Sequence, residues 1–94
     1  MNQKKMLELL SAGRAKIDKV HKLIISDKRE DKENLLMLRE WLYQNADIVK
    51  NALQNDRHVD KVRRQMLEKL LNDYTVTIIE IDDKISRDNL FVKL

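Results

Sequence analysis

Proline and cysteine are absent from this chain of 94 residues, and glycine occurs only once, as Gly13. Without cysteine there is no disulfide framework and no thiolate chemistry. Because proline and glycine interrupt regular structure, their scarcity favours long, uninterrupted helices. Aromatic residues make up only 4% of the chain, so the sequence offers no row of rings on which nucleic-acid bases would stack.

Long apolar runs are missing as well. The chain begins MNQKKMLELL, and no apolar signal core follows these residues. The longest late apolar run lies between Asp73 and Glu80 and is too short to span a bilayer. Hydrophobic residues nevertheless make up 43% of the chain, which is too large a share for a disordered protein. We therefore expect one small cytoplasmic domain over residues 1–94.

Near the N-terminus, apolar residues recur at alternating spacings of four and three, and this coiled-coil-like pattern predicts a helix over about residues 2–25. The stripe consists of Met6, Leu10, Gly13, Ile17, Val20 and Ile24. Gly13 is the exception because it adds no side chain. We favour a tolerated defect or kink there, which costs about 1 kcal/mol relative to alanine. The alternative is a close helix–helix approach that a side chain would block.

Residues 26–32 contain no apolar side chain and are predicted to be a loop, or a loop that runs into a first helical turn, with Asp27 or Asp31 capping the next helix. That helix is expected over about residues 32–53, with two apolar stripes. One stripe is Leu35, Leu38, Leu42, Ala46, Val49 and Leu53, and the other is Met37, Trp41, Ile48 and Ala52. A wide apolar arc is typical of a central bundle helix. The alternative is that Met37 and Trp41 form an exposed groove for a partner.

A third helix is predicted over about residues 58–92, with Asn55 or Asp56 as its cap. Its apolar residues repeat every eleven positions, at Val59, Leu70, Ile81 and Val92, which suits a nearly straight helix. Asn72 and Asp73 leave open a break, followed by a Thr77–Glu80 capping box and a fourth helix. Although residues 75–81 (TVTIIEI) have high strand propensity, the chain has no second strand candidate. The expected fold is an all-α bundle of three or four helices.

Catalytic and ligand-binding motifs are missing. The two histidines lack metal-ligand spacing, and one glycine cannot build a phosphate loop. Arg14, Ile17 and Asp18 resemble the first helix of the helical chorismate mutases, in which an arginine is followed closely by Ile-Asp. The downstream cationic residues and C-terminal polar residues of that family have no evident counterparts. We therefore predict no enzyme and no cofactor or metal.

Charge alternates along the chain although its net value is only +3. Residues 1–29 and 57–70 are basic, whereas residues 30–56 and 71–94 are acidic. The densest basic cluster contains Arg57, Lys61, Arg63 and Arg64, and such residues would bind nucleic-acid phosphates without sequence preference. Binding to nucleic acid through basic helix faces is therefore the alternative function.

The function that we favour is a protein-interaction module, such as an adaptor, chaperone, inhibitor or regulatory accessory protein. Met37 and Trp41 are its candidate contacts with a protein partner. We further expect a dimer in which two copies of the third helix pair antiparallel, because this brings basic starts beside acidic ends. The expected contacts of that dimer are Ile81, Ile85 and Val92, which a long third helix would leave without neighbours in its own chain.

Overall fold

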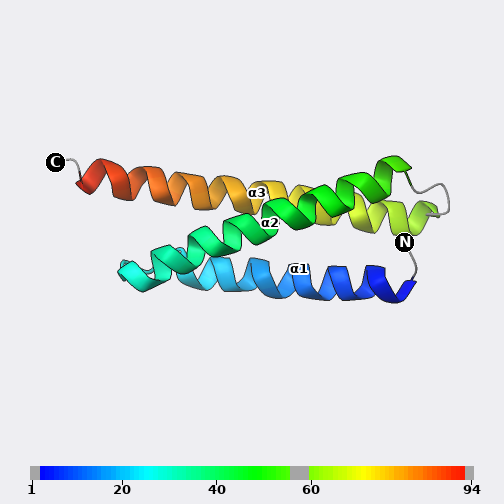
Figure 1. Ribbon diagram of the computed structural model, residues 1–94, viewed down its shortest axis with the longest axis horizontal. Helices are drawn as coiled ribbons and strands as arrows, with labels where there is room; N and C mark the ends of the chain where they lie inside the picture. Colours follow the sequence, from blue (N-terminus) through cyan, green and yellow to red (C-terminus); the bar gives the residue numbers. More distant parts are fainter. Residues whose placement is uncertain (1–2, 56–59, 93–94) are drawn as a thin grey trace.

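The computed structural model describes residues 3–55 and 60–92, with side chains as far as residue 88, and it contains three helices. They are α1 (Gln3–Leu23), α2 (Arg29–Asn55) and α3 (Lys61–Val92). In Figure 1, α1 and α3 run in the same direction and α2 runs in the opposite direction, crossing both of them, and each helix packs against the other two. The molecule is elongated, with extents of 53 × 19 × 16 Å. The predicted all-α bundle is confirmed, and residues 75–81 are helical.

α2 begins at Arg29, three residues before the expected start near residue 32, so the alternative in which the loop runs into a first helical turn is the one observed. Asp31 therefore lies inside the helix, and its predicted role as a cap is wrong. Its carboxylate instead accepts a hydrogen bond from the Ser26 hydroxyl at 2.5 Å, while the same Ser26 oxygen accepts the Lys28 amide at 3.2 Å. Asp27 does not cap α2 either, because its carboxylate lies 3.5 Å from the Lys84 ammonium.

At the other turn, Asn55 is the last residue of α2 and Asp60 precedes α3. The Asp60 carboxylate accepts the backbone amide of Arg63 at 2.8 Å, which is the bond that an N-cap residue makes. Asp60 is therefore the cap of α3 rather than Asn55, and α3 begins at Lys61 rather than His58. The other predicted cap, Asp56, lies outside the described residues.

The predicted break at Asn72 and Asp73 is absent, and α3 continues through both residues. The Thr77 hydroxyl donates to the Asp73 carbonyl oxygen at 2.7 Å, one turn earlier in the same helix. Glu80 faces His21 of α1, with 3.3 Å between its carboxylate and the imidazole Nε2. The Thr77–Glu80 capping box is therefore wrong, because α3 has no break here and both side chains have other partners.

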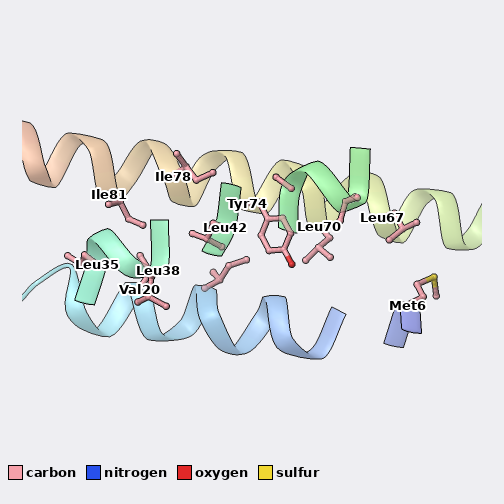
Figure 2. Close-up of a cluster of buried hydrophobic side chains, with 13 residues drawn as sticks. Met6, Val20, Leu35, Leu38, Leu42, Leu67, Leu70, Tyr74, Ile78 and Ile81 are labelled. Atoms are coloured by element: carbon pink, nitrogen blue, oxygen red, sulfur yellow. The ribbon is translucent and has the colours of Figure 1, made fainter. Parts of the chain in front are cut away.

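One hydrophobic core runs along the inner faces of all three helices, and Figure 2 shows side chains from each of them meeting there. The first of the two α2 stripes enters this core, and Leu35, Leu42 and Val49 have at most 1% of their surface exposed. Tyr74 of α3 is the largest fully buried side chain. The buried apolar residues are Met6, Ile17, Val20, Leu35, Leu38, Leu42, Ala46, Val49, Leu67, Leu70, Tyr74, Ile78 and Ile81.

Gly13 lies in the core at the point where α1 meets Tyr74 of α3. A methyl group built on Gly13 would overlap the Tyr74 hydroxyl and lie 3.0 Å from both Leu70 Cδ1 and Tyr74 Cε1. The backbone at Gly13 is ordinary helix, with no positive φ angle. Gly13 is therefore neither a defect nor a kink, and the interpretation that we favoured is wrong. The missing side chain makes room for the aromatic ring.

Candidate protein-interaction surfaces

No group of histidine and acidic side chains in the described residues is arranged to hold a metal ion. Within residues 3–55 and 60–92, none of the helices is both long and apolar enough to cross a bilayer. The remaining candidate sites are therefore surfaces. Three of them lie in the described part of the chain: the groove between α1 and α2, the outer side of α3, and a charged depression beside the α1–α2 loop.

The groove between α1 and α2 displays the second apolar stripe of α2. Met37 has 72% of its surface exposed and Ile48 has 45%, whereas Trp41 is half-buried. The Trp41 ring packs edge-on against Tyr74, with 6.1 Å between the ring centroids. Lys16 of α1 places its ammonium 5.5 Å from the Trp41 centroid, a cation–π arrangement. Trp41 is thus held rigidly by both neighbouring helices, while Met37 projects into solvent.

A hollow of about 240 Å³ lies in the same groove, lined by Lys5, Glu8, Leu9, Ala12, Asn45 and Ile48. Its apolar lining comes from Leu9 and Ala12 on α1 and from Ile48 on α2. We call the surface formed by Leu9, Ala12, Met37, Trp41 and Ile48 the α1–α2 face. The sequence predicted Met37 and Trp41 as site residues but missed the other three, because nothing in one helix's periodicity shows which part of its neighbour lies opposite.

The two edges of the α1–α2 face differ in charge. On α1, Lys16 lies beside Trp41, and Lys19 lies one turn further along the helix. On α2, Glu33 precedes Met37 by four residues and Glu40 follows it by three, so both carboxylates share its side of the helix. The Gln44 amide on the same side donates to the Glu40 carboxylate at 3.4 Å. The face is therefore apolar at its centre, basic along α1 and acidic along α2 near Met37.

Two of the residues predicted to form a dimer contact on α3 pack within their own chain instead. Ile81 has 0% of its surface exposed, and Ile85 is partly buried against the same core. The expectation that these side chains lack neighbours within their own chain is wrong, because α1 and α2 reach far enough along α3 to cover them. Val92 lies in the last turn of α3, and its side chain is outside the described residues.

Two of the four residues of the predicted basic cluster make contacts within the chain. Arg63 pairs with the cap residue Asp60, with Nε 3.5 Å from the carboxylate. The Arg64 guanidinium donates to the Leu53 carbonyl oxygen at 3.0 Å and so joins α3 to the end of α2. Lys61 is exposed, and Arg57 lies outside the described residues. Two of the predicted phosphate ligands thus have structural roles at this turn.

A charged depression of about 830 Å³ lies between the α1–α2 loop and the second half of α3. Its central side chain is Lys84, which is only 10% exposed and lies 3.5 Å from Asp27 and 3.7 Å from Asp88. Lys32 of α2 adds a third contact, at 3.2 Å from Asp88. Because these charges compensate one another, Lys84, Asp27, Asp88 and Lys32 tie the loop to α2 and α3.

The three residues of the chorismate mutase resemblance do not converge on a cavity. The Arg14 guanidinium pairs with the Asp73 carboxylate of α3 at 3.0 Å, and Ile17 belongs to the hydrophobic core. Asp18 is exposed on the outside of α1. Arg14 therefore joins α1 to α3 on the protein surface. When the chain is compared with protein-family models, curated proteins and solved structures, no significant match is found.

Proposed function

We propose that this protein is a helical interaction module that binds a protein partner through the α1–α2 face. The observation that carries the proposal is the exposure of Met37, beside a Trp41 ring that both neighbouring helices hold in place. A rigid aromatic anchor beside a flexible, exposed methionine and an apolar hollow is the arrangement found at energetically important centres of protein interfaces. An adaptor, chaperone, inhibitor or regulatory accessory protein would act in this way.

The shape and charge of the face favour an amphipathic helix as the bound element. A helix lying along the groove between α1 and α2 would place its apolar side chains against Met37 and in the hollow at Leu9 and Ile48. Its edge next to α1 would meet Lys16 and Lys19, so acidic residues on that edge would be attracted. Its other edge would meet Glu33 and Glu40 of α2 near Met37, so basic residues on that edge would be attracted.

Affinity capture with matched variants tests this proposal. Met37→Glu should reduce binding of the partner at least about tenfold, because it places a charge in the centre of the contact. Leu36→Glu is the control, because Leu36 is also exposed (48%) but lies on the α3 side of the same helix. Each immobilised protein is incubated with nuclease-treated native lysate, washed at low and at moderate salt, and the captured proteins are compared.

The supporting result is a captured protein that the wild type and Leu36→Glu retain at moderate salt and that Met37→Glu loses. Far-UV circular dichroism must show the same helix signal for all three proteins. Equal capture by the three proteins would exclude the α1–α2 face. Loss of all captured material after nuclease treatment or at moderate salt would instead favour the polyanion alternative, because electrostatic contacts with phosphates weaken as salt rises.

A further inference from the structure

The side of α3 that faces away from α1 and α2 carries a second regular pattern. Lys69, Asn72, Val76, Ile79 and Asp83 follow one another at spacings of three and four residues, and all five are exposed. Val76 is 46% exposed and Ile79 is 53% exposed. Spacings of this kind align side chains along one line of a helix, as the contact positions of a coiled coil are aligned. We call this line the outer α3 seam.

The outer α3 seam has an apolar centre and opposite charges at its two ends. Lys69 precedes Val76 by seven residues, and Asp83 follows it by seven. Neither charged side chain forms an ion pair with another residue in the described part of the chain. Both are thus available to a partner, unlike Asp73, Glu80 and Asp82 on the flanks of α3, which already pair with Arg14, His21 and Arg39.

We propose that the outer α3 seam binds the same seam of a second copy of this chain, with the two α3 helices antiparallel. A two-fold axis between Val76 and Ile79 places Val76 opposite Ile79 of the second copy. The same operation places Asn72 opposite Asp83 of the second copy. Lys69 then lies about 4.5 Å along the helix axis from that aspartate, within reach of a lysine side chain. The seam is self-complementary in this orientation.

The parallel orientation is disfavoured by the same residues. Two parallel copies in register would place Lys69 against Lys69 and Asp83 against Asp83, and like charges facing each other across an interface weaken association. The apolar centre of the seam also extends sideways, because Ile79 and the half-exposed Tyr43 of α2 line one hollow of about 220 Å³. Side chains flanking the seam of the second copy would enter this hollow.

Dimerisation through the outer α3 seam leaves the α1–α2 face exposed, because the seam residues lie on the side of α3 that faces away from α1 and α2. The inference therefore does not depend on the proposed partner binding. It keeps the antiparallel dimer expected from the sequence but moves the contacts from the buried Ile81 to Val76 and Ile79.

Exchanging the charges tests the proposal in the intact chain. Sedimentation velocity from micromolar to millimolar concentration should show the wild type moving from the 11.2 kDa of one chain towards twice that mass. Lys69→Asp and Asp83→Lys should each weaken the dimer about tenfold or more, because each places like charges together twice across the two-fold axis. The double exchange K69D/D83K should restore the wild-type affinity.

Mixing the two single variants gives a decisive result. A Lys69→Asp chain and an Asp83→Lys chain present opposite charges at both ends of the antiparallel seam, so the mixture should dimerise although neither variant does so alone. Lys22→Asp, on the exposed side of α1, is the matched control and should dimerise like the wild type.

Three results would overturn the inference: a wild type of single-chain mass throughout the concentration range, single variants that dimerise as well as the wild type, or a double exchange and a mixture that do not recover. Equal helix signals by circular dichroism confirm that every variant is folded. Because all three sites are exposed, unfolding is not expected.

Discussion

At the scale of single residues, the contact between Gly13 and Tyr74 is the most sensitive point of the core. Gly13→Ala should lower the free energy of unfolding by about 1 kcal/mol, because overpacking costs about 1–3 kcal/mol and the better helix propensity of alanine returns only about 1 kcal/mol. The crowded atoms belong to Tyr74 and Leu70, which are themselves buried and have little room to move. Urea denaturation measures the change.

The control for Gly13→Ala is the reverse exchange at an exposed position of the same helix. Ala15→Gly should destabilise the protein by about 1 kcal/mol through helix propensity alone. If the Tyr74 ring is the obstacle, removal of its hydroxyl should reduce the cost of the added methyl group, so the two substitutions should be coupled in a double-mutant cycle. A Gly13→Ala protein as stable as the wild type would show that the helices separate without cost.

Tyr74 itself predicts a pH dependence. Its hydroxyl is buried without a hydrogen-bond partner in the described part of the chain, and burial raises the pKa of Tyr74 to about 12 from an ordinary value of 10.0. Below pH 10 both the folded and the unfolded chain keep this proton, and stability is unaffected. Between about pH 10 and 12 the unfolded chain loses the proton first, so stability falls as pH rises.

Tyr74→Phe removes the buried hydroxyl and with it the pH dependence that its raised pKa causes. At neutral pH the variant should be at least as stable as the wild type, because it eliminates a buried hydroxyl that has no partner. Above pH 10 the difference in unfolding free energy should grow in favour of the variant, because only the wild type carries the Tyr74 proton. Denaturant titrations of both proteins at neutral pH and near pH 11 measure this difference in unfolding free energy. A difference that is constant with pH would contradict the raised pKa.

At the scale of elements, the start of α3 depends on Asp60. Asp60→Ala removes the acceptor of the Arg63 amide and should lower the free energy of unfolding by about 1 kcal/mol. Asp60→Asn keeps a capping oxygen but loses the exposed ion pair with the Arg63 guanidinium, and should cost much less. If both substitutions have the same effect in urea denaturation, then the ion pair and not the cap stabilises this turn.

At the scale of the whole molecule, one core joins the three helices, and we expect them to unfold together. The single tryptophan, Trp41, packs on Tyr74 of α3 and lies under Lys16 of α1, so its fluorescence reports contacts among all three helices. The urea transitions followed by Trp41 fluorescence and by far-UV circular dichroism should therefore coincide. A helix signal that persists after the fluorescence change would show that part of α3 unfolds independently.

The alternation of apolar and polar residues was sufficient to predict the helical class, the approximate extent of each helix and the inner stripe of α2. Those properties follow from the sequence because the helical period places residues such as Leu35, Leu42 and Val49 on one side of their own helix, whatever the neighbours are. The helix ends were less predictable. Several polar residues near each turn had the chemistry of a cap, and local geometry decided that Asp60 is one and Asp31 is not.

Only the tertiary structure decided how the helices meet. The register of α1 against α3 places Gly13 under the Tyr74 ring, and it pairs Arg14 with Asp73 and His21 with Glu80. The lengths of α1 and α2 cover Ile81, while the outward side of α3 leaves Val76 and Ile79 exposed. The period of one helix determines which residues share a side of that helix, but the side that stays uncovered depends on where the other two helices lie.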